Sequence, residues 1–329
     1  MTTTNPSFEH RPVMVTEIVE LLGPAPAGVV LDATVGGGGH AAAVLEAHPH
    51  LSVVGLDQDA DAVEAARARL APFGDRVSVH HTRFDRLTDT VRALDLPSLS
   101  GALFDLGVSS PQLDRADRGF AHRHDAPLDM RMDRSATRTA ADVVNGYDEA
   151  ELVRVLRQHG DERFATRIAR AIVAARPVET TRELAALVRD AIPAPARRTG
   201  GHPAARSFQA IRIEVNDELA VLPVALDAAI DLLAPGGRVA VLSYHSGEDR
   251  IAKARLRLAE TGGCACPPQL PCGCGAVPLL RLLGRGGRTP SPEESAANPR
   301  AASARLRAAE KLAQPAPHTP DHDTRGADR

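Results

Sequence analysis

The chain has 329 residues, of which 43% are hydrophobic, enough to fill one large core or two ordinary ones. No apolar run approaches the roughly 18 to 20 residues that a membrane span needs, and the polar start has no signal-peptide pattern, so we expect a cytoplasmic protein without membrane contact. The net charge of −3 is a sum over the whole chain, and two segments, residues 151–214 and 249–311, each contain more Lys and Arg than Asp and Glu. We call these two segments the basic blocks. These fit either a phosphate-binding face or a solvated arginine-rich surface.

Strand-like runs alternate with helical patterns in the first third of the chain, which is typical of a parallel sheet with helices on both faces. The predicted strands there are Val29–Asp32, Leu51–Asp57, Val77–His80 and Gly101–Asp105, and the clearest predicted helix is Asp59–Leu70. The later elements are a helix over 203–233 and strands at Gly236–Ser243, Pro278–Leu283 and Ser303–Arg307. We therefore predict an α/β fold with a doubly wound, mostly parallel sheet.

The fourth and fifth strands are separated by about 130 residues, far more than one crossover helix needs. We interpret the excess as an inserted helical subdomain, residues 109–206, with long loops at 109–148 and 193–206. Its predicted helices are Glu149–Gln158, Glu162–Ala175 and Thr180–Ile192, the last with Thr180 or Thr181 as N-cap. The sheet domain then comprises 1–108 and 207–312, and 313–329 is predicted to be a disordered tail.

A glycine-rich turn, Gly36–Ala41, follows the first strand, and Asp57 ends the second strand about 20 residues later. This spacing matches a dinucleotide fingerprint, with Asp57 as the ribose-binding acid. However, Asp32 ends the first strand, and a carboxylate there would repel a pyrophosphate. S-adenosylmethionine instead carries positive charge on its sulfonium and ammonium groups. The residues therefore favour a methyltransferase, with Asp32 near that charge and Phe84 against the adenine.

The segment Asp105–Leu113 follows the fourth strand and places a carboxylate and small polar groups where ligands bind in open α/β sheets. A hydrogen-bond acceptor such as Asp105 would activate an exocyclic base amine and take its proton, and only an unstacked base reaches such a pocket. His245, after the fifth strand, is a candidate to orient the base, with a structural hydrogen bond as the alternative. The candidate stacking residues, which core packing would equally explain, are Phe120, Phe208 and Tyr244.

Eight motifs, taken together, resemble the signatures of the bacterial MraW/RsmH family. In chain order, between about His10 and Lys311, they are Asp32–Thr34 with Gly38–His40, Asp105–Leu113, Arg118–Phe120, Pro127–Met132, Gly160–Arg163, Ser207–Arg212, Asn216–Leu219 and Tyr244–Arg250. The resemblance implies S-adenosylmethionine-dependent methylation of the exocyclic amino group of a cytidine in the decoding region of 16S ribosomal RNA.

The same resemblance implies the cofactor contacts and the partner. The implied S-adenosylmethionine contacts are Gly38, Gly39, His40, Asp57, Phe84, Asp105 and Gln112, to which the charge argument adds Asp32. The expected partner is 16S ribosomal RNA in the small ribosomal subunit, facing the inserted subdomain and its arginine-rich flanks. We expect a monomer or homodimer. The alternatives are a dinucleotide-dependent oxidoreductase and a non-catalytic RNA-binding assembly factor.

Four cysteines, Cys264, Cys266, Cys272 and Cys274, lie within eleven residues between glycines and prolines. Four thiols so close together are a candidate structural zinc site, although such sites more often use pairs spaced by two residues. Reduced thiols in a surface loop are the alternative, and a reducing compartment disfavours disulfides. The cysteines are remote in sequence from the catalytic motifs, so they have no predicted role in the chemistry.

Overall fold

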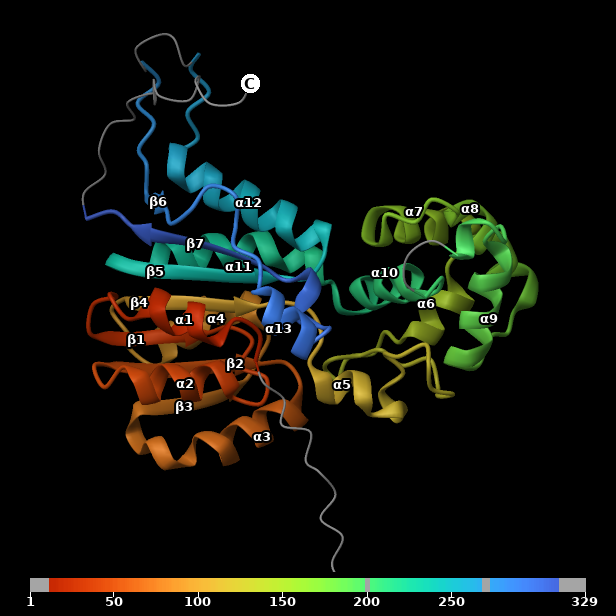
Figure 1. The fold of residues 1–329 in the computed structure, drawn as a ribbon, viewed down its shortest axis with the longest axis horizontal. Coiled ribbons are helices and arrows are strands. Elements are labelled where there is room, and N and C mark those ends of the chain that lie inside the picture. Colours follow the sequence, from red (N-terminus) through yellow and green to blue (C-terminus); the bar gives the residue numbers. More distant parts are fainter. Residues whose placement is uncertain (1–11, 199–201, 268–272, 314–329) are drawn as a thin grey trace, which may run out of the picture. The chain divides into compact units, whose positions relative to one another are not determined.

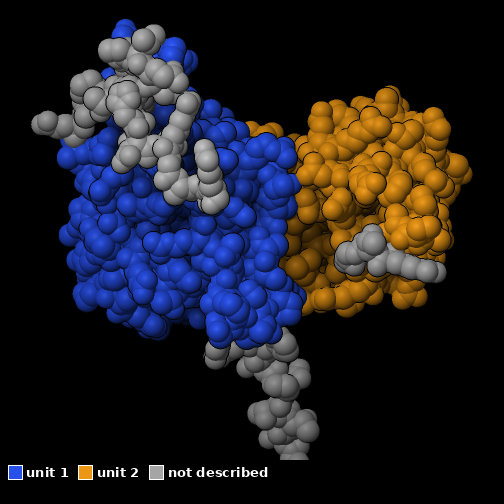
Figure 2. Space-filling view, turned by 45° about the horizontal axis from the view of Figure 1, so that its top comes forward, with its two compact units in different colours: residues 1–106, 221–329 blue, residues 107–220 orange. Residues whose placement is uncertain are grey.

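A computed structural model describes residues 12–198, 202–267 and 273–313, and the chain divides into two compact units (Figure 2). The sheet unit comprises residues 1–106 and 221–329, and the helical unit comprises residues 107–220. Apart from residue 313, the predicted tail lies outside the described residues. In the described part of the chain, none of the helices combines the length and the apolar character needed to cross a bilayer.

The sheet unit contains a seven-stranded sheet in the order β3-β2-β1-β4-β5-β7-β6 (Figure 1). The strands are β1 (Gly28–Asp32), β2 (Leu51–Asp57), β3 (Val77–His81), β4 (Leu99–Asp105), β5 (Leu233–Ser243), β6 (Leu280–Leu282) and β7 (Arg305–Lys311). The first five strands are parallel, and β7 is antiparallel to both of its neighbours. The predicted doubly wound, mostly parallel α/β fold is therefore confirmed, including the two late strands.

Helices cover both faces of this sheet because alternate strand residues point to opposite sides. Val30 and Leu103 face one hydrophobic core, and Leu31 and Phe104 face the other. The first core is covered by α1 (Val15–Leu22), α2 (Gly39–Ala47) and α3 (Ala60–Leu70). The second is covered by α4 (Leu87–Ala93), α11 (Glu218–Leu232) and α12 (Ser246–Thr261). The remaining elements of this unit are α13 (Pro292–Ala297) and the 3₁₀ turns η1 (Ala71–Arg76), η2 (Phe84–Arg86) and η5 (Ala301–Ser303).

The helical unit has a core of its own, formed by the apolar faces of its helices. The helices are α5 (Ser110–Asp114), α6 (Ala140–Gly146), α7 (Glu149–Gly160), α8 (Ala165–Ala175), α9 (Thr181–Ala191) and α10 (Ala205–Asn216), with 3₁₀ turns η3 (Ala116–Arg118) and η4 (Ala196–Arg198). The three helices predicted for the insertion are present. Thr180 caps α9, and Glu183 completes the capping box.

Three sequence-based expectations differ from the structure. The single helix expected over 203–233 is two helices, because Asp217 adopts a left-handed conformation (φ 55°) that ends α10. The division between the units falls at residue 220 rather than 206, because α10 packs against α6 and α7. The segment 109–148, expected to be a loop, contains α5 and α6.

In the helical unit, Arg118 and Asn216, each from one of the motifs named above, hold the loop at residues 130–132 in place. The Arg118 side chain is only 2% exposed and donates hydrogen bonds to the carbonyl groups of Arg131 and Met132, both at 3.0 Å. Asn216, at the end of α10, accepts from the Met132 N–H at 2.8 Å and donates to the Met130 carbonyl at 2.8 Å. These buried polar groups satisfy the backbone of the loop and fix it to α10.

A second polar cluster joins α7 to α10. The Glu214 carboxylate is 11% exposed and accepts hydrogen bonds from Tyr147 at 3.0 Å and Arg154 at 2.8 Å, and it faces His159 Nε2 at 3.0 Å. These interactions, the His159 hydrogen bond foremost, lower the pKa of Glu214 to about 2. The charged form of this carboxylate therefore stabilises the helical unit.

We predict that Glu214→Gln destabilises the chain near pH 6 by roughly 1 to 2 kcal/mol, because the lowered pKa of Glu214, about 2 against 4.5, reflects interactions of the charged form that solvent partly screens. The folded state binds this proton less well than the unfolded state, so the stabilisation is complete above pH 4.5 and disappears as the pH falls toward 2. Urea unfolding of both proteins across this range measures the difference. Glu149→Gln, which removes an exposed carboxylate paired with Arg170, should change stability by less than about 0.5 kcal/mol. Equal losses in the two variants would contradict the prediction.

Candidate active site

Three carboxylates end three neighbouring parallel strands: Asp32 on β1, Asp57 on β2 and Asp105 on β4. The strand order reverses between β1 and β4, and this switch point is where ligands bind in open α/β sheets. The structure therefore brings together residues that lie up to 73 positions apart in the sequence (105 − 32).

Asp32 is 2% exposed, and its Oδ1 accepts a hydrogen bond from the Thr34 N–H at 3.2 Å. Burial raises the pKa of this carboxyl to about 7, partly offset by nearby His40. The charged carboxylate is poorly compensated by the protein alone. A cation at this position would favour the ionised form.

Asp57 holds the glycine-rich turn to the end of β2. Its Oδ2 accepts from the Gly36 N–H at 2.9 Å, and its Oδ1 accepts from the Asp59 N–H at 2.9 Å. Burial raises the pKa of Asp57 to about 6. The turn and the carboxylate are thus one structural unit. The sequence spacing had predicted only a ribose-binding role for Asp57, which stays a prediction.

The glycines Gly38 and Gly39 form the start of α2. Gly38 is the N-cap with φ 76°, and no side chain caps the helix. A Cβ atom on Gly39 would lie 2.2 Å from Pro12, so only glycine fits there. The N-terminus of α2 at Gly38 and Gly39 consequently presents backbone N–H groups without side chains, and a helix N-terminus of this kind suits an anionic group.

His40, Asp105 and Tyr244 form a connected group. His40 is 6% exposed, and its Nε2 donates to the Val13 carbonyl at 2.8 Å, while its Nδ1 lies 3.6 Å from Asp105 Oδ2. The Tyr244 hydroxyl donates to Asp105 Oδ1 at 2.7 Å, and burial and the neighbouring carboxylate raise the pKa of Tyr244. Thr34 Oγ1 accepts from the Asp105 N–H at 2.6 Å. The Tyr244 hydroxyl therefore orients the Asp105 carboxylate, and Thr34 holds its backbone.

His245 is engaged within the first turn of α12. Its Nδ1 accepts from the Gly247 N–H at 3.1 Å, so Nε2 carries the hydrogen. Nε2 lies 3.1 Å from Glu248 Oε1, but it is buried without a hydrogen-bond partner among the described residues. Glu248, 2% exposed, also accepts from the N–H groups of Tyr244 and His245. This capping box fixes the backbone of Tyr244, the residue that orients Asp105. The role of His245 toward the substrate stays a prediction.

The other predicted site residues have defined surroundings. Phe84 packs edge-on against Phe104, with ring centroids 6.0 Å apart. Gln112 belongs to the helical unit, where its Oε1 accepts from the Ser109 N–H at 3.0 Å in the capping box of α5. Sequence reasoning did not identify the contacts of Thr34 and Glu248, and it considered Tyr244 only for stacking. All three belong to motifs named in the sequence analysis, Asp32–Thr34 and Tyr244–Arg250, but a motif does not show which residues its side chains contact.

The family model described as "MraW methylase family" matches residues 7–312. The chain belongs to this family. It is therefore an enzyme, a methyltransferase that uses S-adenosylmethionine as methyl donor, and neither an oxidoreductase nor a non-catalytic factor.

Curated MraW-family relatives align over nearly the full length. The chain is 55% identical to the Ribosomal RNA small subunit methyltransferase H of Thermobifida fusca over 323 residues, covering 94% of this chain and 96% of the relative. It is 56% identical to the protein of the same name from Saccharopolyspora erythraea, covering 92% and 93%. Among solved structures, a putative rRNA-methylase from Clostridium thermocellum is 12% identical, with a TM-score of 0.43 and coverage of 93% and 100%.

We predict that Asp32→Asn makes the cofactor-free enzyme more stable at pH 8, by at most roughly 4 kcal/mol, and by a smaller amount, at most about 1.6 kcal/mol, at pH 5. The raised pKa, about 7 in the folded state against 3.8, means that Asp32 contributes stability below pH 3.8 and that this contribution is lost as the pH rises through 7. Urea unfolding at the two pH values measures the effect.

Asp95→Asn is the matched control, because it removes an exposed carboxylate from the same unit before β4. Its stability should follow that of the wild type at both pH values. A destabilised Asp32→Asn protein at pH 8 would show that the native site compensates the charge of Asp32.

Proposed function

We propose that the chain methylates the exocyclic amino group of a cytidine in the decoding region of 16S ribosomal RNA, acting in the cytoplasm on the small ribosomal subunit. The names of its full-length relatives support the substrate class. The proposal rests on the position of Asp105. This hydrogen-bond acceptor lies at the switch point of the sheet, and Tyr244 and Thr34 hold it in place.

The residues at the ends of β1 and β2 fit S-adenosylmethionine by their chemistry. The carboxylates with raised pKa values, Asp32 and Asp57, are suited to a cationic group and to ribose hydroxyls respectively. The first turn of α2, with Gly38 and Gly39, is suited to the carboxylate of the amino-acid tail. Phe84 offers an apolar surface for the adenine.

Bound S-adenosylmethionine supplies an electrophilic methyl group on a positively charged sulfur. The enzyme's main task is to align the amine with it, and Asp105 accepts a hydrogen bond from that amine. This interaction counteracts delocalisation of the nitrogen lone pair into the base and gives the departing proton an acceptor. Tyr244 is a positioning residue, since it orients the acceptor, and His245 and Glu248 position Tyr244.

The helical unit supplies the surface for RNA in this proposal. Its basic block contains exposed arginines, including Arg163 and Arg167 near the start of α8 and Arg206 on α10. Guanidinium groups bind phosphate oxygens, and the resulting affinity depends on salt. A cytidine must leave its stack to reach a carboxylate at the end of a strand.

Incubation of the enzyme with S-adenosylmethionine carrying a radiolabelled methyl group, and with small subunits from a strain lacking the protein, tests the substrate. We expect label in a cytidine methylated on its exocyclic amine, identified by nucleoside analysis and located by nuclease mapping. Subunits from the complemented strain are the control and should accept no label, since their site is already modified. Label in another nucleoside, or in free protein only, would contradict the proposal.

We predict that Asp105→Asn lowers kcat by at least about 100-fold, because an amide oxygen accepts a hydrogen bond but does not accept the proton. Cofactor affinity, measured by calorimetry, should change by less than about 10-fold if the role is in the chemical step. Asp95→Asn should retain wild-type turnover. Full turnover by Asp105→Asn would remove Asp105 as proton acceptor and leave it a cofactor contact.

A further inference from the structure

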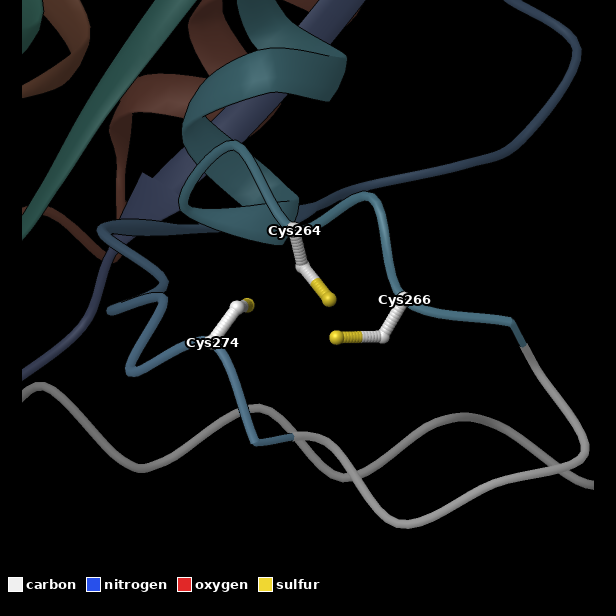
Figure 3. A group of neighbouring side chains, drawn as sticks. All are labelled: Cys264, Cys266 and Cys274. Atoms are coloured by element: carbon white, nitrogen blue, oxygen red, sulfur yellow. The ribbon is translucent and has the colours of Figure 1, made fainter.

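The thiols of Cys264, Cys266 and Cys274 converge on one point of the sheet unit. Their Sγ atoms all lie within 4.8 Å of one another, and Figure 3 shows the three side chains directed toward a common space. The fourth cysteine, Cys272, lies outside the described residues, and the inference rests on the other three.

The backbone brings the two cysteine segments together. Gly262 ends α12 in the left-handed conformation (φ 61°), and a Cβ atom there would lie 2.4 Å from the Val277 backbone, so glycine alone permits this approach. The Leu279 N–H donates to the Ala259 carbonyl at 2.8 Å, which holds the segment after Cys274 against the last turn of α12. The Cys264 N–H donates to the Thr261 carbonyl at 3.1 Å. The convergence is thus built by hydrogen bonds and a close backbone contact, not only by nearness in sequence.

We propose that these three thiols bind a structural zinc ion. In a tetrahedral zinc–thiolate site with Zn–S bonds of about 2.3 Å, neighbouring sulfur atoms are about 3.8 Å apart. The sulfur separations here need to shorten by no more than roughly 1 Å. On binding, each thiol loses its proton to solvent, and the metal forms three sulfur bonds and one to a fourth ligand. No electron is transferred.

The zinc site is structural and separate from methyl transfer. α12 has 16 residues and is therefore about 24 Å long, with Tyr244 and His245 before its first turn and Cys264 beyond its last. The metal would join the C-terminal end of α12 to the segment that leads into β6, the strand at the edge of the sheet. Such a link would fix the chain just before β6, an edge strand of three residues.

The test begins with the full-length enzyme purified under reducing conditions without added metal. We expect elemental analysis to give about one zinc per chain, and X-ray absorption to give three or four sulfur ligands. Replacement of zinc by Co²⁺ should produce the thiolate charge-transfer and tetrahedral d–d absorption bands. These measurements use the wild-type protein, so they do not depend on the folding of a variant.

Cys264→Ser and Cys274→Ser should each lower the zinc content at least about tenfold and reduce Tm, while S-adenosylmethionine affinity stays within about threefold. Ala265→Ser, which adds a hydroxyl to the same loop and removes no thiol, should keep zinc and Tm at wild-type values. The proposal is overturned if the purified protein has no zinc and binds no Co²⁺ after reduction. It is equally overturned if the cysteine variants retain the metal, or if alkylation before lysis shows these cysteines in disulfides.

Discussion

The active site depends on one electrostatic constraint: desolvated carboxylates end adjacent parallel strands, and the described residues around the buried Asp32 compensate its charge only in part. Desolvation raises the pKa of Asp32 to about 7 and that of Asp57 to about 6, so near neutral pH both are poised between charged and neutral forms. The apo protein bears this cost because its sheet cannot relax away from the strand ends. In the function we propose, the cationic cofactor reduces this cost because it favours the ionised form of Asp32.

The remaining elements of the site hold Asp105 in a fixed orientation. Tyr244 reaches its carboxylate from the end of β5, and Thr34 reaches its backbone N–H from the loop after β1. Glu248 in turn holds the Tyr244 backbone through the capping box of α12. An acceptor fixed before substrate arrives loses little entropy when the amine binds, which is how a mostly positional reaction gains rate.

The sequence predicted the sheet well because strand alternation and helix periodicity are local signals, and the strand ends followed from them. Asp32, Asp57 and Asp105 could be placed at one edge by topology alone. The Tyr244–Asp105 hydrogen bond could not be predicted, because it joins residues 139 positions apart and depends on tertiary packing. The end of α10 was missed because a left-handed Asp217 leaves no strong local signal, and the helical pattern continues through it. The role of Arg118 and Asn216 as buried loop anchors is likewise a property of the packed helical unit.

The pKa of the Asp32 carboxyl, with and without ligand, tests the central claim most directly. It is measured by ¹³C NMR of aspartate-labelled protein, with Asp32→Asn used to assign the signal. Our account predicts titration near pH 7 in the free enzyme and a pKa at least about one unit lower with bound S-adenosylmethionine. S-adenosylhomocysteine, which lacks the sulfonium charge, should lower it less. Titration near pH 4 in the free enzyme, or no response to the cofactor, would contradict the account.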